Sequence, residues 1–312
     1  MLQSINYNFN HNSHTNSMFY KNKCLNNKIN FLSVKTKMIS EPVEQDQTIS
    51  TYLWDIFKDT FNGTWCGISK WYDISNLNKP MLIIPSAVYD ISFVDDDNAI
   101  WKGKGLRFHD KELKFNLKRG DKWDEKFLFP GGFGGQSLIE GLSYDKPKQF
   151  HELNFFDQKC RSMIISEYTY NLYNDNILGK LSSIQITPFR NANGCKIGKR
   201  KIYKSPDELL DTLNGWKGER WSYTPDDKLI YSFDDIKSII PITFDEIDYK
   251  NKDLCKVWDD NLICGLPFEI KKGENSEFVY GCKVNDNCFK QLKIIRDKNN
   301  CILSWTFDIY NN

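Results

Sequence analysis

The sequence predicts an all-β protein with two short helices, built from two tandem antiparallel β-barrels that each follow a helix. Three observations predict this fold. Short apolar and aromatic runs alternate with Asn, Asp, Gly and Pro from residue 64 onward, as in sandwiches and barrels. A helix followed by an opening that contains Gly and Trp occurs twice. Residues 278–310 alternate apolar and polar side chains in three runs, as a β-meander does.

Composition favours a soluble chain with about two domains. The 312 residues are 40% hydrophobic and 14% aromatic, which is enough to form a core. No run approaches the roughly 18–20 apolar residues of a membrane helix, so we expect no membrane span. The first 40 residues hold five lysines and no acid, which leaves 37 basic and 41 acidic residues in the rest. A slightly acidic body argues against nucleic-acid binding.

The leader and the domain boundaries follow from changes in composition. Residues 1–42 are rich in Asn, Ser and Lys and are predicted to be a disordered leader. The first 40 of these residues contain no acid and no Arg, which suits a plastid transit peptide, and an Asn-rich tail without a targeting role is the alternative. The first barrel is expected at residues 43–192, a linker at 193–204 and the second barrel at 205–312.

Each predicted helix has its own signals. Apolar residues at three- and four-residue spacing predict a helix over residues 43–61, which Gly63 can end. Ser205 and Glu208 predict a capping box with Pro206 in the first turn of the second helix. Leu209 and the leucines that follow would form its apolar face.

The last strand shows the clearest alternation. Five side chains are predicted on one buried face: Cys301, Leu303, Trp305, Phe307 and Ile309. A strand of this kind needs a covered inner face, which a closed barrel provides. The nine cysteines form no regular framework, so we expect free thiols and no metal site.

The opening that follows each helix is an internal repeat. The first copy contains Gly63, Trp65 and Gly67, and the second contains Gly215, Trp216 and Gly218. The second copy lacks the residue that separates Gly63 from Trp65. A large Trp can close the base of a barrel, while flanking glycines allow the backbone to turn and approach closely. The recurrence predicts two related units.

These residues resemble a known family. Gly63-Thr64-Trp65 is similar to the opening of a calycin, or lipocalin-like, barrel. The wider pattern resembles the two-barrel family of cyanobacteria and plastids that includes the chloroplast biogenesis factor required for ATP synthase. The phycobilin lyase-type calycins are more distant. The resemblance spans about residues 48–310 and is carried by residues 61–67, 129–136 and 264–270 with the strands that follow them.

The resemblance implies a non-enzymatic, chaperone-like assembly factor of the chloroplast stroma. Its partners would be the catalytic and central-stalk subunits of the plastid ATP synthase. The alternative is a calycin that binds a small hydrophobic ligand or acts as a bilin chromophore lyase. In such barrels a late Arg stacks on the opening Trp, which implies structural pairs of Arg190 with Trp65 and of Arg296 with Trp216. No residue that contacts a partner can be matched by motif.

Catalytic signatures are weak. His109 and His151 are the candidate catalytic histidines, and no nucleophile elbow or phosphate-binding loop accompanies them. The sequence leaves enzymatic activity open, and we expect neither catalysis nor a cofactor.

Overall fold

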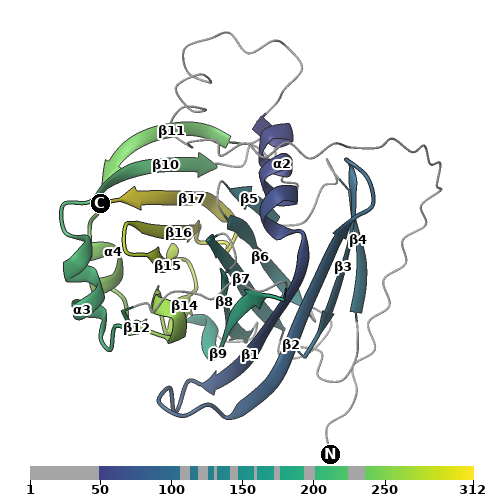
Figure 1. Cartoon of the computed structure of the whole chain (residues 1–312). Coiled ribbons are helices and arrows are strands. Elements are labelled where there is room, and N and C mark those ends of the chain that lie inside the picture. Colours follow the sequence, from purple (N-terminus) through teal and green to yellow (C-terminus); the bar gives the residue numbers. More distant parts are fainter. Residues whose placement is uncertain are drawn as a thin grey trace, which may run out of the picture. The chain divides into compact units, whose positions relative to one another are not determined.

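Two antiparallel sheets make up most of the molecule (Figure 1). The computed structural model describes residues 49–105, 113–118, 126–129, 132–140, 147–157, 160–171, 176–192, 201–223 and 236–312. The helices are α2 (Ile49–Phe61), α3 (Pro206–Leu210) and α4 (Ile247–Lys250), with 3-10 turns η1 (Asp211–Leu213) and η2 (Asp259–Asn261). The strands of the first half are β1 (Gly63–Asp73), β2 (Leu82–Phe93), β3 (Asn98–Lys104), β4 (Leu113–Lys118), β5 (Lys126–Phe129), β6 (Gly132–Glu140), β7 (Lys148–Asp157), β8 (Cys160–Tyr170) and β9 (Ile177–Asn191). The strands of the second half are β10 (Lys217–Tyr223), β11 (Ile236–Thr243), β12 (Leu254–Val257), β13 (Leu262–Leu266), β14 (Glu269–Lys271), β15 (Ser276–Asn285), β16 (Cys288–Arg296) and β17 (Ile302–Asn311).

The strand order confirms the all-β, barrel-like fold. The first sheet runs β4-β3-β2-β1-β9-β8-β7-β6-β5, and β14 also pairs with β9. The second sheet runs β11-β10-β17-β16-β15-β13-β12. In each half the opening strand pairs with both the next strand and the last one, as β1 does with β2 and β9, and β10 with β11 and β17. Each half also follows a helix, as predicted. The division into two separate barrel domains stays a prediction.

Helix α2 packs against the first sheet through aromatic residues. Trp54, Phe57 and Phe61 recur at three- and four-residue spacing and are all buried. The helix lies against β5 and β6, and the Trp54 indole N–H donates to the carbonyl of Asp96 at 2.8 Å. The predicted helix is therefore present from residue 49, and Phe57 of its expected apolar stripe is buried, whereas residues 43–48 and the side chains of residues 49–53 lie outside the described part.

Helix α3 begins at the predicted capping box. The Ser205 hydroxyl accepts from the N–H of Glu208 at 3.2 Å, and the Glu208 carboxylate accepts from the N–H of Lys204 at 2.9 Å. Two backbone donors at the helix start are thereby satisfied. Leu209 and Leu213 are buried members of the apolar cluster on the outer face of the second sheet, so the short helix is held by packing as well as by its cap.

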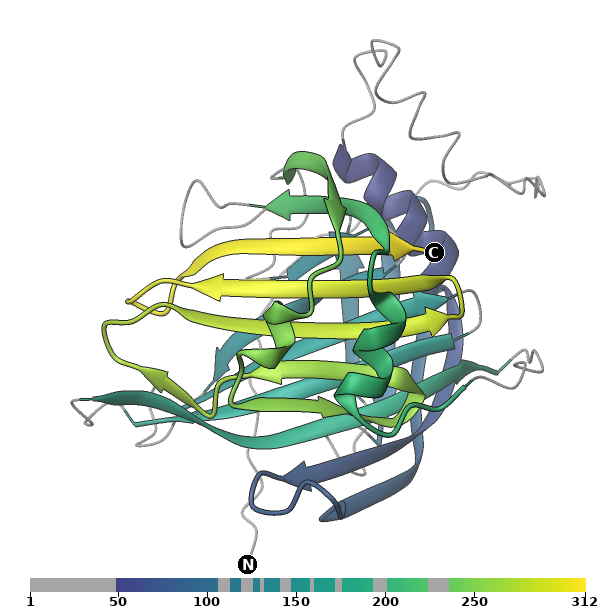
Figure 2. The ribbon, with the colours of Figure 1, turned by 90° about the vertical axis from the view of Figure 1, so that its left-hand side faces the viewer.

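The two sheets face each other and share one core. Along β8, Ser166 and Tyr168 point toward the second sheet, whereas Arg161 points toward α2. Along β15, Tyr280 belongs to the core between the sheets and Val279 to the cluster beneath α3 and α4. Figure 2 shows these helices in front of the second sheet, with the first sheet behind it. Both faces of the central strands are therefore covered.

One part of the predicted last strand is wrong. Trp305 and Phe307 are buried as expected, but Leu303 is 42% exposed. The pairing of β16 with β17 shifts register at this end, where Arg296 pairs with Ile302 and the next pair is Ile295 with Ser304. The irregularity moves Leu303 out of the alternation.

Candidate functional site

The first glycine of each opening has a backbone conformation that favours glycine. Gly63 has φ of 121° and Gly215 has φ of 78°. Both lie between a helix and the opening strand of a sheet. Residues with a side chain rarely adopt these angles, so the two glycines allow the helix-to-strand turn. This accounts for the glycine at the same place in both copies of the repeat.

The second glycine of each opening lets two strands approach closely. A Cβ on Gly67 would lie 2.5 Å from the carbonyl oxygen of Pro188 on β9. A Cβ on Gly218 would lie 2.1 Å from the carbonyl oxygen of Ile309 on β17. In both halves the glycine therefore lies against the last strand of its own sheet. In both halves the repeat therefore lets the opening strand pair closely with the last strand.

Arg161 is the buried arginine that faces α2 in the first sheet. Its guanidinium lies 3.9 Å from the ring centre of Tyr89 and 4.6 Å from that of Phe61. Trp65 is fully buried beside it, packs edge-on against Phe156 and donates its indole N–H to the carbonyl of Phe61. Arg161 thus occupies the aromatic surroundings that the family resemblance assigned to Arg190.

Arg190 and Arg296 have other contacts than the implied Trp stacks. Arg190 forms a bidentate ion pair with Asp260 of η2, with N–O distances of 2.6 and 3.0 Å. This pair links the first sheet to the second. Arg296 is fully buried and donates to the carbonyl of Asn300 at 2.7 Å. The cation above Trp216 is the ammonium of Lys283 instead.

His151 lies in the core between the sheets. Its Nδ1 is 3.0 Å from the Tyr280 hydroxyl, which is also 2.6 Å from the Ser166 hydroxyl. Burial, with a smaller effect of Arg296, holds the pKa of His151 well below its usual value. A neutral, fully buried imidazole has the surroundings of a structural residue. His109, the other candidate, lies outside the described residues.

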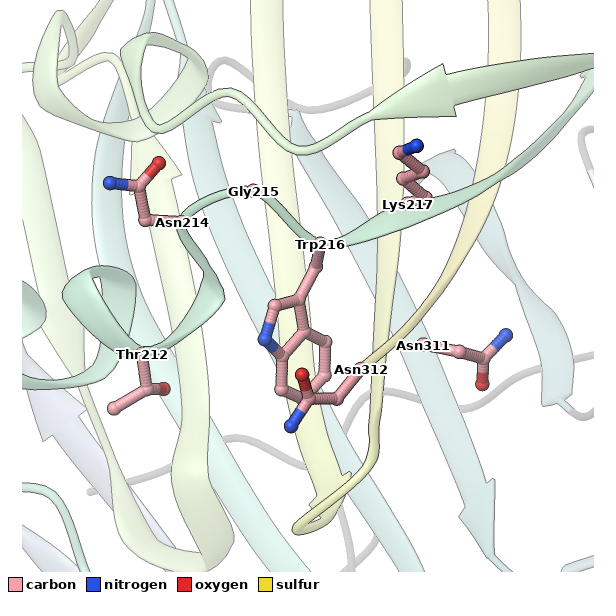
Figure 3. Close-up of a pocket in the computed structure, with 7 residues that line it drawn as sticks. All are labelled: Thr212, Asn214, Gly215, Trp216, Lys217, Asn311 and Asn312. Carbon is pink, nitrogen blue, oxygen red and sulfur yellow. The ribbon is translucent and has the colours of Figure 1, made fainter.

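A hollow of about 480 Å³ opens at the second copy of the repeat (Figure 3). It is lined by Thr212, Asn214, Gly215, Trp216, Lys217, Asn311 and Asn312. Figure 3 shows the Trp216 indole near the side chains of Thr212 and Asn312, whereas the side chains of Lys217 and Asn311 point away from it. The Trp216 ring therefore lies beside one hydroxyl and one amide group, both able to donate hydrogen bonds.

Lys283 is only 4% exposed and contacts two of the residues that line this hollow. Its ammonium donates to the Thr212 hydroxyl at 3.3 Å and lies 4.3 Å from the ring centre of Trp216. The Tyr203 ring is 5.8 Å away. Among the described residues, Lys283 has no carboxylate partner. The sequence analysis did not single out Lys283. The alternation of apolar residues in β15 predicts the face of the strand on which Lys283 lies, but it does not predict the nearby rings of Trp216 and Tyr203.

The β1–β2 hairpin carries exposed apolar side chains. Ile68, Met81 and Ile83 are 49%, 58% and 52% exposed. Ile83 is directly opposite Lys70, whose ammonium pairs with Asp259 of η2. We call Ile68, Met81 and Ile83 the hairpin patch. It lies on the face of the first sheet that the second sheet covers further along.

Two further features concern the described part alone. No helix there is long and apolar enough to cross a membrane. The residues described also form no cluster of three or more His, Cys, Asp or Glu side chains able to hold a metal ion.

Comparison with known proteins shows only that the fold of this chain is similar to that of a solved structure. No family model matches the chain, and no curated protein matches it significantly. The structure is similar to the crystal structure of a protein of unknown function from the DUF3598 family of Nostoc punctiforme. That similarity has a TM-score of 0.56 at 13% identity and covers 86% of this chain and all of the other. A putative outer membrane protein of Bacteroides fragilis aligns with a TM-score of only 0.23 at 12% identity, over 85% of this chain and all of the other.

Proposed function

We propose that this chain is a non-enzymatic assembly factor that binds a protein partner through the hairpin patch. The carrying observation is that three large apolar side chains are exposed on the β1–β2 hairpin, with Ile68 on β1, Ile83 on β2 and Met81 directly before β2. Exposed apolar clusters on folded proteins mark interaction surfaces, because each side chain gains hydrophobic free energy when a partner covers it.

The position of the patch supports the proposal. On the same face of β1, Tyr72 is covered by Trp258 of the second half, with ring centres 4.8 Å apart. Lys70 on this face is paired with Asp259. Ile83 of the hairpin patch lies directly opposite Lys70, so the patch adjoins this contact with the second half. It therefore adjoins a surface that already binds the segment between β12 and β13 of the same chain.

The partner follows from the family resemblance. We propose that it is the soluble head of the plastid ATP synthase, through its catalytic and central-stalk subunits, and that the protein works in the chloroplast stroma. A bilin- or ligand-binding barrel, the alternative, needs room on the face of the first sheet that meets α2. On that face Trp54, Phe57 and Arg161 are buried against aromatic side chains, and this packing occupies the place where a ligand would bind. The packing therefore favours the partner-binding proposal.

Affinity purification of the tagged chain from plastid lysate, followed by mass spectrometry, tests the proposal. We expect enrichment of ATP synthase head subunits over a lysate control with an unrelated tagged protein. Repeated purification without these subunits would exclude the proposed partner. A coloured eluate, or enrichment of phycobiliproteins, would instead support the bilin alternative.

A further inference from the structure

We propose that three lysines on β3 and β4 form, together with the hairpin patch, one docking surface for an acidic, amphipathic segment of the protein partner. The lysines are Lys102, Lys104 and Lys114, and we call them the lysine ridge. The inference rests on the proposed function, because it states the chemistry of the partner that the hairpin patch would bind. It goes beyond that function in assigning a charge and a polarity to the segment that makes the contact.

The three lysines lie on one face of the first sheet. On β3, Trp101 is buried against Tyr89, whose ring belongs to the aromatic cluster that meets α2. Successive side chains of a strand point to opposite faces, so Lys102 lies on the face away from α2 and Lys104 lies on the same face. Lys114 of β4 is directly opposite Lys102 and therefore shares its face.

The lysine ridge adjoins the hairpin patch. Lys104 is paired with Val88 of β2, which is paired with Cys66 of β1, so these three positions form one row across the sheet. Figure 1 shows β1 to β4 side by side. Neighbouring strands are about 4.8 Å apart, so the backbones at Lys104 and Cys66 are roughly 10 Å apart. Ile68 of the hairpin patch follows Cys66 by two residues and, like Cys66, is exposed, so a segment that covers Ile68 passes close to the ridge.

The lysine ridge has an excess of positive charge. None of its lysines forms an ion pair with another described residue. Lys102 and Lys114 are directly opposite each other, an arrangement in which like charges repel. Asp90 is opposite Lys102 on β2, but its carboxylate also accepts from the Thr64 hydroxyl at 2.8 Å and cannot balance three ammonium groups. The remaining charge is complementary to carboxylates on a partner.

A protein segment fits this surface better than a nucleic acid does. The exposed side chains beside the lysines are the aliphatic ones of the hairpin patch, which gain free energy when apolar side chains cover them. Neither the hairpin patch nor the lysine ridge contains an aromatic ring on which a base could stack. An amphipathic segment with acidic residues beside its apolar ones would satisfy both parts of the surface at once.

Fluorescence anisotropy with two labelled peptides and the full chain tests the chemistry of the surface. The first peptide has about 16 residues, all Glu or Leu, with Leu at the three- and four-residue spacing of a helix, and the second has Lys in place of every Glu. We expect the Glu peptide to bind at least about tenfold more tightly than the Lys peptide at low salt. The difference should shrink as salt is added, because exposed charges are screened. Tighter binding of an oligothymidylate of similar length would identify a nucleic-acid site and overturn the proposal.

Two charge-reversal variants make the test specific. Lys104→Glu combined with Lys114→Glu changes two exposed positions of the lysine ridge, and Lys272→Glu combined with Lys298→Glu makes the same change of net charge at exposed positions of the second half. We expect the ridge variant to bind the Glu peptide at least about tenfold more weakly and the control variant less than about twofold more weakly, once circular dichroism shows that both are folded. No binding of the Glu peptide to the native chain, equal binding of the two peptides, or equal affinity of the two variants would overturn the proposal.

Purified ATP synthase head subunits, measured by biolayer interferometry, separate this inference from the proposed function. We expect the ridge variant to bind the subunits at least about tenfold more weakly than the control variant does. If both variants bind the subunits as tightly as the native chain, the proposed function stands and the docking role of the lysine ridge is wrong. If the native chain binds the Glu peptide through the ridge but does not bind the subunits, the docking surface stands and the proposed partner is wrong.

Discussion

The guanidinium carbon of Arg161 lies 3.9 Å from the centre of the Tyr89 ring, and both side chains are buried in the first sheet. Glu152 connects them, because its carboxylate accepts from the Tyr89 hydroxyl at 3.0 Å and lies 3.9 Å from Arg161 Nη2. Burial and the nearby Glu152 raise the pKa of Tyr89, so the phenol stays neutral and donates this hydrogen bond. The arrangement holds α2 and β8 to one aromatic cluster.

Removal of this arginine should destabilise the first sheet. Arg161→Ala leaves Glu152 without its cation and opens space between aromatic rings, so we expect the free energy of unfolding to fall by about 3 kcal/mol. Urea denaturation followed by circular dichroism measures the change. Lys104→Ala, at an exposed position of β3, is the control and should change it by less than about 0.5 kcal/mol. If both variants lowered the free energy of unfolding by a similarly small amount, the aromatic cluster would not depend on the charge of Arg161.

The second sheet has its own buried ion pair. Asp308 is fully buried and accepts two hydrogen bonds from Arg220, each at 2.8 Å. We expect Asp308→Ala to lower the free energy of unfolding by about 3–5 kcal/mol, since it leaves a partly buried guanidinium unpaired. The double variant with Arg220→Ala should lose less than the sum of the two single variants. If the losses of unfolding free energy measured by urea denaturation were strictly additive, they would contradict a direct interaction between Asp308 and Arg220.

His151 should make stability depend on pH in a defined direction. The folded chain holds the pKa of His151 well below its usual value, while the unfolded chain binds a proton below about pH 6.5. The free energy of unfolding should therefore fall as the pH is lowered from about 6.5, by up to about 1.4 kcal/mol per pH unit, until the folded pKa is reached. His151→Gln removes this contribution and keeps a polar group near Tyr280. Equal slopes of the native chain and the variant between pH 7 and 5 would contradict the prediction.

Cysteine reactivity should follow burial. Burial raises the pKa of the Cys264 thiol to about 12, and the side chain is fully enclosed beside Trp258. Cys66 is exposed on β1. We expect Cys66 to react with a thiol reagent in the native state and Cys264 to react only on unfolding, because attack needs an accessible thiolate. Peptide mass spectrometry after timed alkylation measures both rates, and fast native labelling of Cys264 would contradict the packing.

Local signals were predictable from the sequence. The Ser205–Glu208 capping box and the helix-to-strand turns at Gly63 and Gly215 depend on neighbouring residues, and the structure shows both features. Leu303 was placed wrongly because the register shift of β16 and β17 interrupts simple alternation. The contacts of Arg190 depend on η2, which lies 70 residues later in the chain, so no local pattern could show them.

A weak signal for the buried arginine was present. Arg161 stands near the start of an apolar run, residues 160–170, and an arginine in a buried strand requires partners. The hairpin patch was harder to foresee. Its isoleucines match the alternation of a covered strand, and only the position of the second sheet shows that they remain exposed.

The most direct test of the proposed function compares two isoleucines that are equally exposed. Ile83 belongs to the hairpin patch and Ile247 lies on α4, and both are 52% exposed. Tagged Ile83→Asp and Ile247→Asp chains are tested for recovery of ATP synthase head subunits from plastid lysate, after circular dichroism shows that both are folded. We expect Ile83→Asp to lower recovery by at least about tenfold and Ile247→Asp to retain it, because a charge in an apolar interface costs several kcal/mol. Equal recovery by both variants would contradict binding through the hairpin patch.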